Sequence, residues 1–191
     1  LQFSPVKQYA LEQNLPLLQP EKLKDEAFVE ALREWKADLQ IVVAFRMLPE
    51  VVWNMPRLGT FNLHASLLPQ YRGAAPINWA VINGDTETGI TTFFLRHEID
   101  TGEVIQQVRI PIADTDNVGI VHDKLMMLGG KLVTETVDAI LNDAVKPIPQ
   151  EEMAIVGELR PAPKIFKDTC RIDWNQPVKR IYDFIRGLSP Y

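Results

Sequence analysis

Several stretches of apolar and β-branched residues predict the strands of a sheet. The run 39–45 (LQIVVAF), ended by Arg46, predicts a strand buried on both faces. A second strand is expected at 59–64, and the segments 89–96 and 103–112 are rich in β-forming residues. Because only a short turn joins these last two segments, we expect them to pair antiparallel.

Helical spacing of apolar residues predicts helices between and after these strands. The expected helices cover 5–14, 21–36, 49–55, 75–83, 117–141 and a further stretch from 178. A short apolar piece at 15–19 predicts an additional strand, and Gly129-Gly130 lowers the helical signal or marks close packing. The alternation of helix and strand through the first 140 residues predicts an α/β fold with a mostly parallel sheet.

The periodic spacing of apolar residues ends near residue 143. Four prolines stand between 146 and 164, a spacing that predicts an extended, exposed linker over 143–164. We therefore expect a catalytic domain at 1–142 and the beginning of a second domain at 165–191. The chain starts at Leu1 without an initiator Met, so it is expected to be an excerpt of a longer protein.

Composition and charge narrow the class of protein. Apolar residues make up 46% and charged residues 24% of the chain, which is typical of a globular protein. The net charge of −5 argues against general coating of nucleic acid by this chain. Cys170 is the only cysteine, which excludes an internal disulfide and favours a reducing, cytoplasmic location. No apolar run approaches the roughly 18 residues of a membrane span.

Asn62, His64 and Asp100 are the candidate catalytic residues. If 59–64 is a strand, the side chains of Asn62 and His64 point to the same side, because strand side chains alternate. Asn and His can donate to a developing oxyanion, and a carboxylate can orient the His or accept a proton. These residues could equally be hydrogen-bonded structural groups at a strand end, and Asp100 before Thr-Gly is by itself typical of a turn.

Other kinds of chemistry find little support in the pattern. His64, His97 and His122 are far apart, and no metal-ligand spacing is present, so we expect no metal. No serine or cysteine nucleophile stands in an evident elbow motif. The candidate residues therefore suit transfer of an acyl-type group to an amine, with the substrate supplying the nucleophile.

The stretch 61–79 resembles the signature loop of the folate-dependent formyltransferases. It contains Asn-x-His, then Ser-Leu-Leu-Pro and then Arg-Gly, and the partner motif Asp-Thr-Gly stands at 100–102. The likeness covers nearly the whole chain. Within the family it most resembles the members that formylate methionine on initiator tRNA. Four motifs carry this resemblance: Ser4–Lys7, Arg72–Pro76, Gly84–Gly89 and Arg171–Trp174.

The resemblance implies a Rossmann-like formyltransferase domain, a linker, and a small second domain that helps to hold tRNA. It implies that Asn62, His64 and Asp100 are catalytic and that 10-formyltetrahydrofolate is the formyl donor. The residues expected to border the folate site are Ser66, Leu67, Leu68 and Pro69. Arg72 and Lys7 are the candidates for the tRNA side, and the enzyme is expected to be a monomer.

The sequence departs from the family pattern in places, and two alternative functions stay open. The family's first β-α-β segment and most of its second domain are not in this sequence, so most of the tRNA-binding positive surface is expected elsewhere. Arg46 stands where a Gly is common in the family, which puts the following loop in doubt. The rivals are a formyltransferase for a small amine, such as a sugar nucleotide or glycinamide ribotide, and a non-catalytic folate-binding module.

Overall fold

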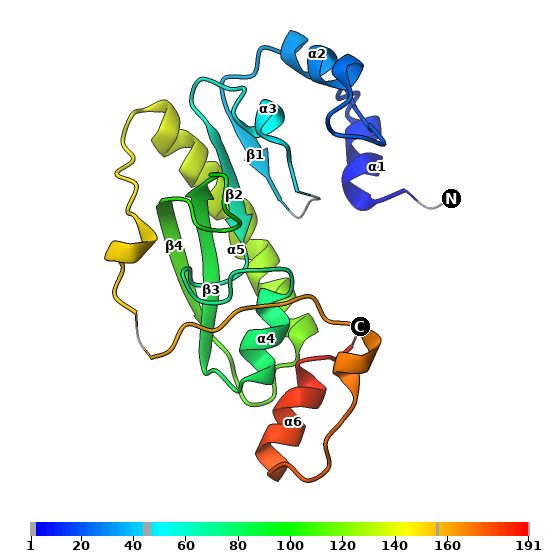
Figure 1. The fold of residues 1–191 in the computed structure, drawn as a ribbon, viewed down its shortest axis with the longest axis vertical. Coiled ribbons are helices and arrows are strands. Elements are labelled where there is room, and N and C mark those ends of the chain that lie inside the picture. Colours follow the sequence, from blue (N-terminus) through cyan, green and yellow to red (C-terminus); the bar gives the residue numbers. More distant parts are fainter. Residues whose placement is uncertain (1–2, 44–46, 156, 191) are drawn as a thin grey trace.

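A four-stranded sheet forms the centre of the computed structural model, which describes residues 3–43, 47–155 and 157–190 (Figure 1). The strands stand in the order β1-β2-β3-β4. They comprise β1 (Gln40–Val42), β2 (Thr60–His64), β3 (Glu87–Phe94) and β4 (Val104–Pro111). Strand β1 pairs parallel with β2, whereas β2–β3 and β3–β4 are antiparallel.

The predicted α/β class is confirmed, but the parallel part of the described sheet is limited to β1 and β2. The antiparallel pairing of the last two strands is confirmed as well. Between β2 and β3 the chain turns through the short helix α4 (Pro76–Ile82). The register pairs His64, the last residue of β2, with Thr91 inside β3, so β3 begins beyond the end of β2. An antiparallel return of this kind needs no crossover helix over the sheet face.

The helices follow the predicted order with shifted boundaries. They are α1 (Pro5–Glu12), α2 (Glu26–Glu34), α3 (Glu50–Trp53), α5 (Val118–Leu141) and α6 (Val178–Arg186), besides α4. Helix α2 starts later than expected because the Asp25 side chain accepts a hydrogen bond from Ala27 N and caps it. The strand expected at 15–19 is wrong, since these residues form no strand. No helix of the described ranges is both long and apolar enough to cross a membrane.

The main core lies between the sheet and α5. Val121, Leu125 and Leu132 of α5 are buried against Ile90 and Ile110 of the sheet. One face of β1 has no such cover, because Ile41 is 45% exposed, so burial on both faces is not observed there. The residue Arg46, which follows the predicted strand, lies outside the described residues.

Close packing explains one of the two consecutive glycines of α5. A Cβ at Gly129 would lie 2.9 Å from Leu63 Cδ2 of β2, whereas a Cβ at Gly130 would meet nothing within 4 Å. Gly129 therefore lets the helix approach the strand that carries the candidate catalytic residues. Of the two readings of this pair in the sequence, close packing applies to Gly129.

The segment 143–164 runs along the sheet and past α4 as an extended connection (Figure 1). Most of its described residues are exposed, as the prolines predict, and a 3-10 helix forms at Gln150–Glu152. Two of its side chains are nevertheless buried, Gln150 (1% exposed) and Ala162 (0%). The linker is thus attached to the body of the protein at these points, and its boundaries as a domain linker stay a prediction.

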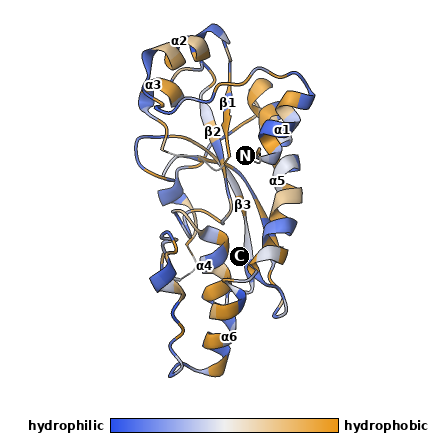
Figure 2. Ribbon diagram, turned by 90° about the vertical axis from the view of Figure 1, so that its right-hand side faces the viewer, coloured by the Kyte–Doolittle hydropathy of each residue, from blue (hydrophilic) through white to orange (hydrophobic). Residues whose placement is uncertain are grey.

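Helix α6 packs beside α4, as both views show (Figures 1 and 2). Arg186 donates to the backbone carbonyls of Ala113 (3.0 Å) and Asp116 (2.7 Å), just before α5. The buried Asp183 accepts hydrogen bonds from Arg186 Nε (2.8 Å) and Lys179 Nζ (2.7 Å). A charge network at the centre of the contact therefore fixes α6 to the segment that precedes α5.

Replacing the central carboxylate of this network tests its contribution to stability. Burial opposes ionisation of Asp183, but the hydrogen bonds from Lys179 and Arg186 outweigh it and lower the pKa of the carboxyl group. A lowered folded-state pKa contributes stability above the unfolded value near 3.8, which is lost as pH falls through the folded value. Asp183→Asn should lower the free energy of unfolding at pH 7 by about 1.5–3 kcal/mol.

Urea unfolding of both proteins between pH 7 and pH 3 measures this effect. The difference between wild type and Asp183→Asn should shrink below about pH 4. The matched control is Asp138→Asn on the exposed face of α5, which should show no such pH dependence. A difference for Asp183→Asn that stays constant with pH would contradict the ionic role of the network.

Candidate functional site

A large cavity opens where β2 ends. Its volume is about 1490 Å³, and its wall is formed by β2, α3, the start of α4, one side of α5 and the turn at 95–100. Asn62, His64 and Asp100 all line it. The structure thus brings the three predicted catalytic residues to one cavity from two segments of the chain, while their catalytic role stays a prediction.

His64 is held in a defined orientation at the carboxyl end of β2. Its side chain is buried, and its Nε2 lies 3.0 Å from the backbone oxygen of Tyr71. A carbonyl oxygen can only accept a hydrogen bond, so Nε2 carries a proton and donates it there. The other ring nitrogen, Nδ1, lies 3.9 Å from Asp100 Oδ2, and the ring edge packs against Phe93. Nδ1 is therefore the nitrogen available for chemistry.

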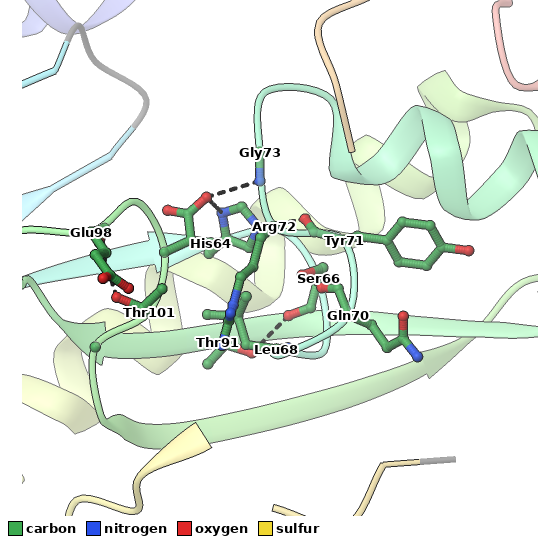
Figure 3. A network of polar contacts seen from close by, with 12 residues as sticks. His64, Ser66, Leu68, Gln70, Tyr71, Arg72, Gly73, Thr91, Glu98 and Thr101 are labelled. Carbon is green, nitrogen blue, oxygen red and sulfur yellow. Dashed lines mark hydrogen bonds and ion pairs between the residues drawn. The ribbon is translucent and has the colours of Figure 1, made fainter. Parts of the chain in front are cut away.

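Asp100 stands in the turn between β3 and β4 with a φ of 55°. Its Oδ2 accepts a hydrogen bond from Gly73 N (2.9 Å), and Figure 3 shows Gly73 and His64 close to each other. The 3.9 Å gap to His64 Nδ1 is too long for a direct hydrogen bond. A water molecule or a small reacting group could contact both side chains across it.

Gly73 is required at its position for two reasons. Its φ is 128°, a region that residues with a Cβ rarely adopt, and a Cβ there would lie 2.4 Å from the backbone oxygen of Ala162. The Ala162 oxygen also accepts hydrogen bonds from Ala74 N and Ala75 N. The extended linker at Ala162 thus packs against this turn and directs the Gly73 N–H toward Asp100.

Asn62 presents its amide to the cavity from the middle of β2. The residue is 6% exposed, and its backbone is paired with Val42 on one side and Phe93 on the other. No hydrogen bond to its side chain is found among the described residues. An amide donor fixed by two neighbouring strands and unused within the described protein suits an acceptor atom of a substrate.

The predicted folate-bordering residues Ser66, Leu67, Leu68 and Pro69 do not line this cavity. Ser66 is fully buried and donates to the backbone oxygen of Gln70 (2.6 Å). The backbone of this loop is held by Thr91 of β3, whose Oγ1 donates to the Ser66 oxygen and accepts from Leu68 N. These contacts shape the loop from inside, and a contact with folate stays a prediction.

The two predicted tRNA-side residues lie in different surroundings. Arg72 is partly buried, and its guanidinium donates to Gln150 Oε1 from Nε (3.0 Å) and from a terminal nitrogen (2.6 Å). Lys7 lies near the start of α1, with its Nζ 4.2 Å from the centre of the Phe3 ring. Neither residue lines the cavity, although Arg72 is joined through Gln150 to the backbone of Asp100.

Tyr71 connects the loop to the linker. Burial and the hydrogen bond that its hydroxyl donates to Asp85 (2.6 Å) raise the pKa of Tyr71. Arg160 of the linker donates to both the Tyr71 hydroxyl (3.1 Å) and Asp85 (2.7 Å). The hydroxyl therefore stays neutral at physiological pH and keeps its donor, which fixes the backbone whose carbonyl holds His64.

Two residues that organise the site are absent from the sequence-based prediction. Thr91 is an ordinary β-branched residue in a strand, and Gln150 lies in a proline-rich segment expected to be exposed. Both act through contacts with segments remote in sequence, and local periodicity cannot reveal such contacts. Only the motif Asp-Thr-Gly at 100–102 pointed to the turn that Gln150 contacts.

Among the described residues, no group of three or more His, Cys, Asp or Glu side chains is placed to hold a metal ion. His97 lies on the rim of the cavity with its Nε2 3.4 Å from Glu50 and its ring against Trp53. This exposed pair is a surface contact.

Comparison with known proteins places this architecture among formyltransferases. Residues 1–137 match the family described as formyl transferase, and residues 164–191 match the formyl transferase C-terminal domain. The methionyl-tRNA formyltransferase of Bacteroides thetaiotaomicron is 91% identical over the whole chain, and that of Parabacteroides distasonis is 77% identical. The chain spans 59% of the length of these relatives.

Solved structures share the fold at low sequence identity. A 4-N formyltransferase from Francisella tularensis superposes with a TM-score of 0.75 at 22% identity, over 97% of this chain and 73% of that one. A sugar 3N-formyl transferase, WlaRD, solved with dTDP and 5-N-formyl-THF, gives 0.73 at 20% identity, over 95% and 62%. HypX from Aquifex aeolicus, in complex with tetrahydrofolic acid, gives 0.66 at 23% identity, over 84% and 27%.

The buried hydroxyl of Thr91 offers a direct test of how the 66–69 loop is built. Thr91→Val keeps the shape of the side chain but removes its hydrogen bonds to the loop and to Gln107. The free energy of unfolding should fall by about 1–3 kcal/mol, because buried polar groups lose their partners. Denaturant unfolding measures this, with Thr134→Val on the exposed face of α5 as the control. Equal effects of the two changes would contradict the structural role of Thr91.

Proposed function

Because the chain belongs to the formyl transferase family, we propose that the protein transfers a formyl group to an amine at the cavity described above. The donor is 10-formyltetrahydrofolate, and the acceptor is the α-amino group of methionine carried by initiator tRNA. The high identity to relatives named methionyl-tRNA formyltransferase supports this acceptor over a small amine. The sugar formyltransferases share only the fold at this level of identity.

The observation that carries the proposal is the meeting of three polar side chains at one cavity. The unused amide of Asn62, Nδ1 of His64 and the carboxylate of Asp100 all face it. Formyl transfer needs a donor to an oxyanion and a group that accepts the proton of the amine. The set provides both without a protein nucleophile or a metal.

The reaction follows from this geometry. The amine attacks the formyl carbon, and a C–N bond forms while the carbonyl oxygen becomes an oxyanion. Asn62 and a protonated His64 Nδ1 donate to that oxygen. Asp100, 3.9 Å from His64 Nδ1, accepts the proton that the amine loses. The oxyanion then re-forms the carbonyl as the bond from the formyl carbon to the folate nitrogen breaks, and that nitrogen receives the proton from Asp100, directly or through a water molecule, as tetrahydrofolate leaves.

The cavity also suits the donor. It is large enough for a folate, and apolar side chains such as Leu48, Trp53 and Leu95 cover part of its wall. Flat ring systems bind in apolar clefts with a few placed polar groups. The loop 66–69, which resembles the folate-bordering loop of the family, lies behind this wall. We expect it to support the folate site by keeping the wall in place.

The residues proposed to contact tRNA, Arg72 and Lys7, lie outside the cavity. Two of the five guanidinium N–H groups of Arg72 donate to Gln150, which ties Arg72 to the turn, so we expect it to contribute to tRNA binding mainly through the shape of that turn. Lys7 keeps a cationic side chain at the first turn of α1 and is the better candidate for a phosphate contact.

Removal of one oxyanion donor tests the function. In the full-length protein, Asn62→Ala should lower kcat for formylation of methionyl initiator tRNA by roughly 10²–10³, as loss of one oxyanion donor does. Asn142→Ala at the exposed end of α5 is the matched control and should retain wild-type kcat. Formylation is measured with charged initiator tRNA and with a sugar-nucleotide amine side by side. Wild-type kcat in Asn62→Ala, or turnover of the sugar-nucleotide amine alone, would overturn the proposal.

A further inference from the structure

We propose that Gln150 of the linker is a positioning residue that sets the place of the Asp100 carboxylate. The inference rests on the proposed function to the extent that Asp100 takes part in the reaction. Gln150 is 1% exposed although it lies in the proline-rich segment between the two predicted domains. All of its side-chain hydrogen bonds go to the two turns that meet at the cavity.

The Gln150 amide makes four hydrogen bonds. Its Oε1 accepts from two nitrogens of Arg72, at 3.0 and 2.6 Å. Its Nε2 donates to the backbone oxygens of Asp100 and Gly102, both at 2.8 Å. Every donor and acceptor of the amide is therefore in use.

These partners also determine which way the amide faces and why an amide is needed. A guanidinium group only donates and a carbonyl oxygen only accepts, so Oε1 must face Arg72 and Nε2 must face the turn. A carboxylate could keep the contact with Arg72 but could not donate to the two carbonyls. An apolar side chain of similar shape could make neither contact.

Gln150 thereby braces the two turns against each other. Arg72 directly precedes Gly73, whose N–H holds Asp100 Oδ2, while the backbone oxygen of Asp100 is held by Gln150 itself. Residue 100 is thus fixed at both its main chain and its side chain, in a left-handed conformation with a φ of 55°. A shift of this turn would change the 3.9 Å separation between Asp100 and His64. Misplacement of a catalytic group by about 1 Å can cost roughly 10²-fold in rate.

A close approach on the other side of the turn limits its alternatives. A Cβ at Gly102 would lie 1.6 Å from the backbone oxygen of Phe94. The turn therefore passes so close to the end of β3 that no side chain fits between them. The turn is therefore set by β3 on one side and by Gln150 on the other. Removing the amide releases only the second of these constraints.

Two substitutions of Gln150 in the full-length protein test the proposal. Gln150→Met removes all four hydrogen bonds, and Gln150→Glu keeps an acceptor for Arg72 but loses both donations to the turn. We expect kcat for formylation to fall roughly 10–100-fold in both, with KM for tRNA and for the formyl donor nearly unchanged. Wild-type kcat in Gln150→Glu would overturn the proposal, because the turn would then not need the amide donor.

A matched control separates positioning from general loss of stability. Thr136 of α5 is fully buried and hydrogen-bonded to Thr92 and Gln106, away from both turns. Thr136→Val should also destabilise the fold but should retain wild-type kcat well below its melting temperature. An equal loss of kcat in Thr136→Val and Gln150→Met would overturn the proposal in favour of a merely structural role.

A second readout does not depend on activity. The Gly73 amide donates to Asp100 Oδ2, so its ¹H–¹⁵N resonance reports on the position of that carboxylate. The resonance should shift in Gln150→Met and stay in place in Thr136→Val. An unshifted resonance in Gln150→Met would overturn the positioning role. Absence of formylation by the wild type would instead count against the proposed function, so the two failures are distinguishable.

Discussion

The hydrogen bond from Gly73 N to Asp100 Oδ2 joins the two turns on which the whole site depends. One turn follows β2 and carries the backbone that holds His64, and the other links β3 to β4 (Figure 3). A hydrogen bond from an N–H group to a charged acceptor contributes about 1.5–3 kcal/mol to stability, enough to hold the two turns together. Without it, Gln150 would still hold the main chain of Asp100, but the carboxylate would be free to rotate away from the imidazole.

The linker takes part in this arrangement, because the Ala162 oxygen closes against the Gly73 turn and Arg160 holds Tyr71. The segment 143–164 therefore holds the turns of the site in place and also connects α5 to α6. Helix α6 adds a further attachment through the buried Asp183 and Arg186. The segment 143–164 and helix α6 are therefore both held to the sheet and its helices by specific polar contacts.

Much of the fold could be predicted from the sequence, because periodicity reports which face of an element is buried. Helix α5 and the antiparallel β3–β4 pair followed from apolar spacing and a short connection. The direction of β3 relative to β2 did not, since it depends on where α4 packs. The meeting of Asn62, His64 and Asp100 could be anticipated from motifs, whereas the burial of Gln150 could not, because it arises from contacts 48–78 residues away in sequence.

The central claim is that His64 and Asp100 act on one reacting group across the 3.9 Å gap between them. A double-mutant cycle on kcat/KM for formylation tests this most directly, with His64→Ala, Asp100→Ala and the double variant compared with wild type. Residues that act as a unit give strongly non-additive losses, so the double variant should be only slightly slower than the slower single variant. If the two losses multiply, the side chains act independently, and the shared role across the gap is contradicted.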